Sequence, residues 1–243
     1  MTFNDLGLNK LLLKAIKDQG YDKPTPIQAQ AIPVILKKKD ILAGAQTGTG
    51  KTAGFTLPML ELLLRSKHQT KQHHVKALIL TPTRELALQV EESVAIYGKH
   101  TSYKSCVIFG GVKINPQIVA LRKGIDIVVA TPGRLLDHIS QKTINLSHVD
   151  FLILDEADRM LDMGFVNDIK KVIAVLPKER QTLLFSATYS DSIKKLSNNF
   201  LKSPTLIEVA RANTSSETVK QAIYHVDKTR KRELLTHLIN EEN

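Results

Sequence analysis

The sequence predicts an α/β fold in which helices cover both faces of a mostly parallel sheet. Short, continuously apolar runs of strand length alternate along the chain with longer stretches of helical periodicity. Strands that are buried on both faces have such runs, because the crossover helices of parallel strands cover both sides of the sheet. A glycine-rich turn follows the first of these runs, at a strand end where ligands of such sheets bind.

The first elements precede that turn. Apolar residues recur at the spacing of one helix face, which predicts a core-facing first helix carrying Leu8, Leu11, Leu12, Ala15 and Ile16. The prolines between residues 20 and 28 predict an extended, rigid segment, and a helix is expected over 28–36. A lysine-rich turn at 37–40 then leads into the next strand.

From there, strands and helices alternate. The apolar runs predict strands over 41–45, 76–80, 105–109, 125–130, 151–154, 182–185 and 205–209. The stretches between them predict helices over 51–64, 84–98, 116–121, 133–140, 165–174 and 191–199. In a parallel sheet the residues that follow the strands share one edge, so these residues are the candidates for a ligand site.

The domain organisation is predicted from the end of the chain. Residues 1–213 are expected to form one domain, and Thr214, Ser215 and Ser216 are typical of a linker. A strand over 219–227 and a helix over 228–240 should follow, but two elements cannot enclose a core. Residues 214–243 are therefore expected to hold the linker and the start of a truncated second domain, disordered or packed on a neighbouring molecule.

Composition limits the partners. The formal net charge of the 243 residues is +10, which suits a polyanion such as nucleic acid, although a merely basic surface is the alternative. The single cysteine, Cys106, excludes an internal disulfide, and its apolar neighbours predict a buried structural thiol. No apolar run reaches the length of a bilayer crossing, so we expect a cytoplasmic protein with no membrane partner.

The glycine-rich turn has the composition of a phosphate-binding loop. After Ala45, it reads Gln46, Thr47, Gly48, Thr49, Gly50, Lys51 and Thr52. The glycines let backbone N–H groups approach phosphate oxygens, Lys51 can reach the β- and γ-phosphates, and the Thr52 hydroxyl can ligate Mg²⁺. The common pattern opens with Gly where this chain has Ala45, and an ordinary turn before a helix is the alternative.

A second candidate site follows the strand predicted over 151–154. That strand delivers three carboxylates together, on Asp155, Glu156 and Asp158. In phosphate-loop NTPases an acid at this position holds Mg²⁺, so Asp155 is the candidate metal ligand. Glu156 is then the candidate general base that activates water. The alternative, a charged turn at a strand end, fits one acid better than three beside a phosphate loop.

The run from Asp155 to Asp158 resembles the signature of the DEAD-box ATP-dependent RNA helicases. Residues 1–216 are similar to the first RecA-like domain of that family, with an RhlE-like run at 159–165. The resemblance implies ATP and Mg²⁺ as cofactors. It also implies an adenine-reading region over 1–29, in which Gln28 bonds adenine and Phe3 or Tyr21 stacks on it, with Lys23 and Thr25 in the same segment.

Further segments resemble the family's RNA-contacting motifs. They contribute the candidate residues Pro82, Arg84, Gly110, Gly111, Thr131, Pro132, Gly133 and Arg134. Each segment follows a predicted strand, so the segments should share one edge and bind phosphate and sugar with little base preference. Ser186 and Thr188 belong to a segment that resembles the motif linking ATP to strand separation, and the resemblance implies that it acts through Asp158.

These features predict the first domain of an RNA-dependent ATPase that separates short duplexes. The resemblance implies a second RecA-like domain of the same protein that closes over ATP and RNA and supplies an arginine finger. The fragment alone is expected to be monomeric and nearly inactive. The alternatives are a phosphate-loop ATPase that acts on DNA or drives transport, and a non-catalytic RNA-binding module with a vestigial nucleotide site.

Overall fold

The computed structural model describes residues 1–45, 48–66, 73–209 and 222–241. Gln46 and Thr47 of the predicted phosphate loop lie outside the described residues, as does the predicted linker at 214–216. The chain divides into two compact units, Met1–Ala210 and Arg211–Asn243. The first unit carries the sheet, and the second carries the last helix.

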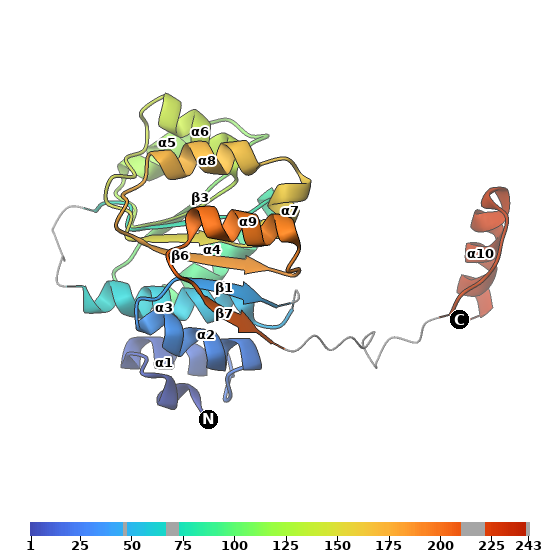
Figure 1. Ribbon diagram of the computed structural model, residues 1–243, viewed down its shortest axis with the longest axis horizontal. Helices are drawn as coiled ribbons and strands as arrows, with labels where there is room; N and C mark the ends of the chain where they lie inside the picture. The colour runs from blue at the N-terminus through green and yellow to red at the C-terminus, as the bar shows by residue number, and fades with distance from the viewer. Residues whose placement is uncertain (46–47, 67–72, 210–221, 242–243) are drawn as a thin grey trace. The chain divides into compact units, whose positions relative to one another are not determined.

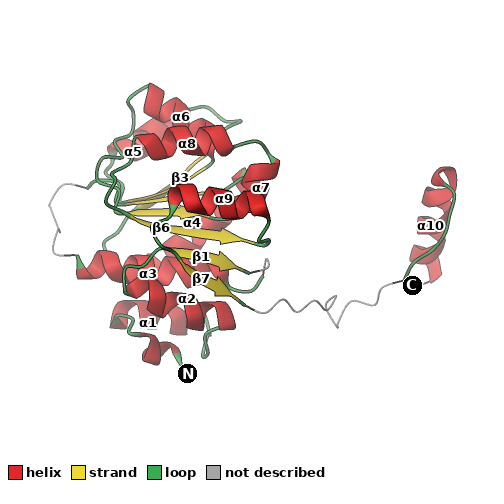
Figure 2. Ribbon diagram, viewed as in Figure 1, coloured by secondary structure: helices red, strands yellow, loops and turns green. Residues whose placement is uncertain are grey.

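Parallel strands form one sheet in the first unit (Figure 2). They are β1 (Ile41–Gly44), β2 (Ala77–Leu80), β3 (Ser105–Ile108), β4 (Ile127–Ala130), β5 (Phe151–Leu154), β6 (Gln181–Ser186) and β7 (Thr205–Glu208). Their order is β3-β4-β2-β5-β6-β1-β7, and every neighbouring pair is parallel. Leu80 of β2 pairs with Leu154 of β5, so these two strands end side by side.

Helices cover both faces of this sheet (Figure 1). They are η1 (Phe3–Leu6), α1 (Lys10–Asp18), α2 (Pro26–Leu36), α3 (Lys51–Arg65), α4 (Arg84–Gly98), α5 (Asn115–Arg122), α6 (Pro132–Ser140), α7 (Ala157–Asp162), α8 (Val166–Ala174) and α9 (Asp191–Phe200). Alternate strand side chains enter different apolar clusters: Ile41 packs with residues of α1 to α4, and Leu42 with residues of α6 to α9. The predicted fold class is confirmed.

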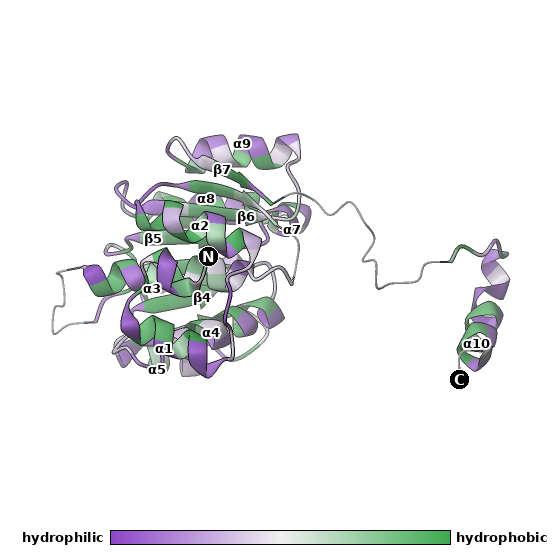
Figure 3. Cartoon of the chain, turned by 90° about the horizontal axis from the view of Figure 1, so that it is seen from below, coloured by the Kyte–Doolittle hydropathy of each residue, from purple (hydrophilic) through white to green (hydrophobic). Residues whose placement is uncertain are grey.

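The strands are hydrophobic along most of their length, as Figure 3 shows, because both faces are covered. The helices begin at residues that suit a helix start. Pro26 occupies the first turn of α2 after the N-cap Thr25, so this helix starts before the predicted residue 28. The Thr83 hydroxyl accepts a hydrogen bond of 3.3 Å from the Leu86 N–H and caps α4.

Parts of the sequence prediction are wrong. The strand predicted over 219–227 is absent from its described part, Ala222–Asp227, where the described tail offers no second strand to pair with it. Helix α7 was not predicted, because six residues are too few to show a helical period. Leu11 is 39% exposed although it lies in α1, which buries Leu12, Ala15 and Ile16, and Leu8 is buried but precedes this helix.

The second unit contains η2 (Lys228–Arg230) and α10 (Lys231–Glu241), where a helix over 228–240 was predicted. Leu235 and Ile239 of α10 are exposed. The expectation of a disordered or externally packed tail stays a prediction. Within the described residues, none of the helices combines the length and the apolar composition that a membrane crossing requires.

Candidate active site

The carboxyl ends of the strands bring the predicted site residues to one edge of the sheet. Lys51 follows β1, Ser186 ends β6, and Asp155 follows β5, and these three strands are consecutive neighbours. The other half of the edge is formed by β2, β4 and β3, which lead into Pro82, Thr131 and Gly110 respectively. The edge is therefore divided into a half with the phosphate loop and the acids and a half with the predicted RNA segments.

The phosphate loop leads directly into α3. Gly50 has a φ of 87°, in the left-handed region, and α3 begins at the next residue, Lys51. The Lys51 side chain is buried, and its Nζ has no hydrogen-bond partner among the described residues. A buried ammonium without a partner is costly, so this geometry favours an anion at the Nζ atom.

Asp155 lies close enough to Lys51 for the two charges to interact. Burial raises the pKa of Asp155 to about 6, because the ionised carboxylate has lost its water; the Lys51 ammonium lowers that pKa, while the charge of Glu156 raises it. The Glu156 N–H donates a hydrogen bond of 3.1 Å to Asp155 Oδ1. The negative charge of this buried carboxylate is only partly balanced by its neighbours, so a bound cation would stabilise it, as in a metal site.

Glu156 has a left-handed backbone, with φ 52° and ψ 51°, at the N-cap of α7. For a residue with a side chain this conformation costs about 1–2 kcal/mol. The turn aligns the carboxylate with the start of α7, where Glu156 Oε2 lies 3.3 Å from Arg159 Nη1. The Glu156 side chain is only 12% exposed, so it is held within the site rather than in solvent.

Asp158 joins the acidic turn to the end of β6. Its Oδ2 accepts a hydrogen bond of 3.1 Å from the backbone N–H of Ala187. Ser186 and Thr188 bond each other instead: the Ser186 hydroxyl donates to the Thr188 carbonyl oxygen at 2.9 Å and accepts from the Thr188 N–H at 3.2 Å. The contact predicted for this segment is thus made by backbone, and the two hydroxyl residues shape the turn that presents it.

A pocket of about 250 Å³ adjoins the phosphate loop. Of the predicted nucleotide residues, its lining includes Phe3, Tyr21, Lys23, Thr25, Gln28, Gly48, Gly50 and Thr52. Phe3 is buried, whereas Tyr21 is 54% exposed. The Gln28 amide already bonds the backbone: its Oε1 accepts from the Thr25 N–H at 2.9 Å, and its Nε2 donates to the Gly50 carbonyl oxygen at 3.1 Å.

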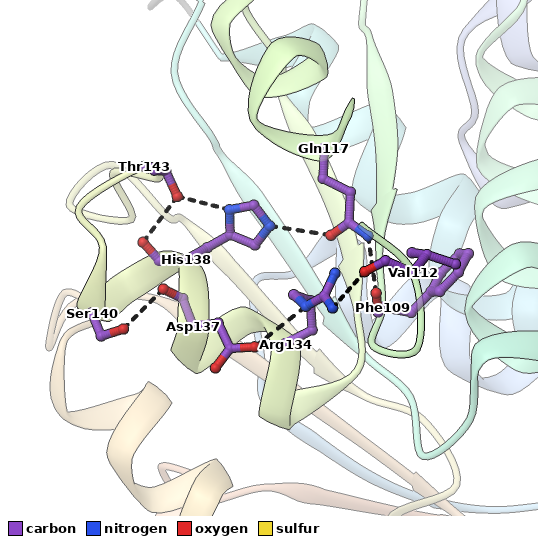
Figure 4. A network of polar contacts seen from close by, with 8 residues as sticks. All are labelled: Phe109, Val112, Gln117, Arg134, Asp137, His138, Ser140 and Thr143. Atoms are coloured by element: carbon purple, nitrogen blue, oxygen red, sulfur yellow. Dashed lines mark hydrogen bonds and ion pairs between the residues drawn. The ribbon is translucent and has the colours of Figure 1, made fainter. Parts of the chain in front are cut away.

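The opposite half of the edge carries two arginines in different environments. Arg84 is exposed and lies over the Phe109 ring, 5.4 Å from its centroid, beside Gly111. A Cβ on Gly111 would lie 2.8 Å from Arg84 Nη1 and would displace the guanidinium, and the left-handed φ of 79° also favours glycine there. Arg134 is only 11% exposed, and its Nη2 donates a 2.8 Å hydrogen bond to the Val112 carbonyl oxygen (Figure 4).

The remaining predicted RNA residues differ in their access to a ligand. The side chains of Pro82, Thr131 and Pro132 are buried. Gly110, Gly111 and Gly133 are at least partly exposed, and no atom outside their neighbouring residues lies within 4 Å of a Cβ built on Gly110 or Gly133. This surface therefore offers backbone and arginine groups, rather than proline or threonine side chains.

The family model described as DEAD/DEAH box helicase matches residues 25–196 of the chain. The chain belongs to the DEAD/DEAH box helicase family. The match runs from the N-cap of α2 into α9, so it includes both halves of the ligand edge.

Alignments with relatives in this helicase family cover nearly the whole chain. "DEAD-box ATP-dependent RNA helicase CshA" of Bacillus cereus (strain ATCC 10987 / NRS 248) is 44% identical over 239 residues, and "DEAD-box ATP-dependent RNA helicase RhpA" of Helicobacter pylori (strain B128) is 40% identical. These alignments cover 98% of this chain but only 45% and 47% of the relatives. The chain thus spans about half the length of the curated relatives that it matches. The RhlE-like assignment stays a prediction.

A crystal structure of a DEAD box protein from the hyperthermophile Methanococcus jannaschii has the same fold. The TM-score is 0.80 at 40% sequence identity, and the match covers 98% of this chain and 63% of that chain. The parallel sheet with helices on both faces is therefore the architecture of a DEAD-box RecA-like domain.

Sequence reasoning missed some residues of this helicase domain. Ser93 and Tyr97 of α4 line the pocket beside Gly48 and Gly50, and only the packing of α4 against α1 and α3 brings them there. Tyr189 covers Gly44 and donates a hydrogen bond of 2.6 Å to the Ile207 carbonyl oxygen, closing the end of β1. Ser93, Tyr97 and Tyr189 do not belong to a sequence motif, so only the three-dimensional structure identifies them.

Proposed function

We propose that this chain is the first RecA-like domain of an ATP-dependent RNA helicase. It binds ATP with Mg²⁺ and the RNA backbone, and it couples ATP hydrolysis to the separation of short duplexes when joined to its second domain. The observation that carries the proposal is the buried Lys51 Nζ, which has no hydrogen-bond partner among the described residues and lies beside the buried carboxylate of Asp155. A metal–triphosphate group satisfies both charges at once.

On the nucleotide side, the backbone N–H groups of the phosphate loop and Lys51 hold the phosphates. Thr52 and Asp155 fit Mg²⁺, because they offer hard oxygen ligands and Mg²⁺ is usually held by few carboxylates together with phosphate oxygens. When bound, Mg²⁺ supplies positive charge that stabilises the developing charge on the phosphates. Glu156 orients and deprotonates the attacking water as general base.

The adenine is held in the pocket beside the phosphate loop. Gln28 keeps one Nε2 hydrogen and one Oε1 lone pair beyond its bonds to Gly50 and Thr25, so its amide can still read the adenine edge. Phe3 or Tyr21 contacts the ring, and Lys23 and Thr25 complete this side of the pocket. Residues 1–29 are accordingly the proposed adenine-reading region.

On the RNA side, exposed backbone at Gly110, Gly111 and Gly133 and the guanidinium of Arg84 contact phosphate and sugar. Such contacts give affinity with little base preference, and they can include the 2′-OH that distinguishes RNA from DNA. Asp158 is the proposed link between ATP hydrolysis and strand separation, through its bond to Ala187, with Ser186 and Thr188 shaping the receiving turn.

Residues 1–213 are the proposed ATP-binding domain, and residues 214–243 the linker and start of the second RecA-like domain. That second domain supplies the arginine finger, which is worth roughly 10³–10⁵ in rate. The 243-residue chain alone is therefore a monomer that binds nucleotide weakly, binds RNA poorly and hydrolyses ATP very slowly. Its single cysteine is consistent with a cytoplasmic location.

The test is the substitution Glu156→Gln in the protein that includes the second domain. The amide keeps the shape of the side chain but cannot take a proton, so turnover of ATP should stop while ATP binding persists. Steady-state ATPase assays with RNA and equilibrium nucleotide binding measure the two properties. Unchanged turnover would refute the proposed base. Strong RNA-stimulated hydrolysis by the 243-residue chain alone would contradict the need for a second domain.

A further inference from the structure

A buried polar network connects α5, α6 and the end of β3 (Figure 4). His138 of α6 is fully buried. Its Nε2 lies 3.1 Å from Gln117 Oε1, and its Nδ1 lies 2.7 Å from Thr143 Oγ1. Gln117 of α5 in turn donates from Nε2 to the Phe109 carbonyl oxygen at 2.9 Å. The network thus runs from the residue after β3 to the residues after α6.

The hydrogen positions in this network follow from its ends. Because the Gln117 NH₂ group donates to Phe109, the amide oxygen faces His138, and His138 Nε2 must carry the hydrogen. In the neutral ring Nδ1 is then an acceptor, and the Thr143 hydroxyl can donate to it. Thr143 Oγ1 also lies 3.1 Å from the His138 carbonyl oxygen, but that oxygen already accepts from the Thr143 N–H at 3.0 Å, so the hydroxyl hydrogen is available to Nδ1.

Arg134 adds a second connection between the same elements. It lies one helical turn before His138 on α6, and its Nη2 donates to the Val112 carbonyl oxygen at 2.8 Å. The turn after β3 is therefore held at Phe109 through Gln117 and at Val112 through Arg134, with Gly110 and Gly111 between the two points. Both attachments lead to α6, whose start carries Thr131, Pro132 and Gly133.

We propose that Gln117, His138 and Thr143 are positioning residues for RNA binding, which fix the glycine turn at 110–111 relative to the first turn of α6. This inference rests on the proposed function, because it assigns the network to the RNA half of the edge. The three residues do not touch RNA. They hold the backbone N–H groups of the glycine turn at a fixed distance from those at the start of α6. RNA binding then does not have to order the glycine turn.

The experiment is a titration of the protein that includes the second domain with single-stranded oligouridylate, followed by amide NMR. The variants are Gln117→Leu, His138→Phe and Thr143→Val, each of which removes the side-chain polar contacts of one residue while keeping most of its volume. Thr143→Ser keeps the hydroxyl and is the conservative rescue. Ser140→Ala on the same helix is the matched control, because it removes a hydroxyl that bonds only within α6.

Loss of one buried link should raise the dissociation constant for oligouridylate about five- to tenfold. The affinity for ATP should change less than about twofold, because the nucleotide half lies on other strands. Hydrogen exchange at the amides of Gly111, Val112 and Lys113 should accelerate in the same variants, without RNA present. Thr143→Ser and Ser140→Ala should behave like the parent chain in all three measurements.

The outcomes separate the two proposals. If the parent chain shows RNA-induced shifts at residues 110–112 and 131–134 but the variants bind as tightly as it does, the positioning role is overturned. A parallel loss of ATP affinity in the variants would also overturn it, because that pattern indicates general damage to the fold. If the parent chain shows no shifts at these segments, the proposed RNA-binding function itself fails. Thr143→Val, at the outer end of the network, decides the matter if His138→Phe does not fold.

Discussion

Gln28 and Gly50 are joined by a hydrogen bond of 3.1 Å from the Gln28 side-chain amide to the Gly50 carbonyl oxygen. Gly50 immediately precedes Lys51, so the side chain of one helix, α2, fixes the end of the phosphate loop at the start of another, α3. The pocket wall and the phosphate loop therefore form one connected structure. A change at Gln28 should alter phosphate binding, and a change at Gly50 should alter the pocket.

Gly50→Ala tests this connection. Gly50 has a left-handed φ of 87°, and a Cβ there would lie 2.5 Å from Gln28 Nε2. We expect the free energy of unfolding to fall by about 2–4 kcal/mol, from backbone strain and the displaced amide together. Gly48→Ala is the matched control, because its φ is 81° but no atom lies within 4 Å of the added Cβ.

Urea unfolding of both variants gives the comparison. Gly48→Ala should show only the strain, about 1–2 kcal/mol. Equal destabilisation by the two substitutions would mean that the Gln28 contact contributes nothing to the loop.

Lys51→Met should weaken ATP binding about 10- to 100-fold, because a charge-assisted contact to phosphate contributes about 1.5–3 kcal/mol. The same substitution should raise the pKa of Asp155 above its value of about 6, because the Lys51 ammonium lowers that pKa. Nucleotide titration and carboxyl-carbon NMR measure the two effects. Lys39→Met, in the exposed turn before β1, should change neither. An unchanged Asp155 pKa in Lys51→Met would show that the two charges do not interact.

Asp155 also gives stability a pH dependence. Its pKa is raised from 3.8 to about 6 on folding, so between these values the folded state binds more protons than the unfolded state. The contribution of Asp155 to stability is therefore fully present below pH 3.8 and is lost as the pH rises through about 6. At pH 7, Asp155→Asn should be more stable than the parent chain by about 1–3 kcal/mol.

Urea unfolding of both proteins between pH 4 and pH 7.5 measures this difference, which should shrink towards the acid end. Taking the difference cancels the titration of the other carboxylates. A constant difference across this range would show that Asp155 does not titrate there.

Asp158→Ala tests the link between the acidic turn and β6. It removes the acceptor of the Ala187 N–H, so the free energy of unfolding should fall by about 1 kcal/mol. In the protein that includes the second domain, the same change should uncouple ATP hydrolysis from duplex separation. The number of ATP molecules consumed for each strand released should therefore rise. Asp162→Ala on the same helix is the control, and an exposed change of this kind is usually within about 0.5 kcal/mol. If Asp158→Ala and Asp162→Ala consume the same amount of ATP for each strand released, Asp158 does not couple hydrolysis to duplex separation.

The sequence was sufficient for much of the fold because the core strands are continuous apolar runs. Ile127–Ala130 and Phe151–Leu154, for example, are buried at every position, so composition alone marks them. The ends of strands and helices are harder to predict from composition, because hydrogen bonding determines them. Strand β6, for example, begins at Gln181, whose side-chain amide bonds the backbone of Ile35 and Lys39. Helix α7 escaped prediction because six residues are too few to show a helical period, and composition does not reveal the left-handed Glu156 from which it starts.

The candidate site divides in the same way. Lys51 and Asp155 were predictable as a pair, because Asp155 directly follows one buried strand, the glycine-rich turn before Lys51 follows another, and parallel strands end together. The burial of the Arg134 side chain was not predictable, because this arginine bonds the Val112 carbonyl oxygen, 22 positions earlier in the sequence. The contact of Gln117 with His138 likewise joins residues 21 positions apart that carry no motif. Such contacts are properties of tertiary packing.

The order of strands along the ligand edge has a mechanical consequence. β2 and β5 adjoin without an intervening strand or hinge, and their backbones are hydrogen-bonded over four residue pairs. Neighbouring strands lie about 4.8 Å apart, so this junction sets the spacing between the residues that follow β2 and those that follow β5. In the proposed helicase, we therefore expect that bending of the sheet does not carry an event at the phosphates to the RNA. Any relay has to travel through the turns above the edge, or through a second body that grips both ligands from outside.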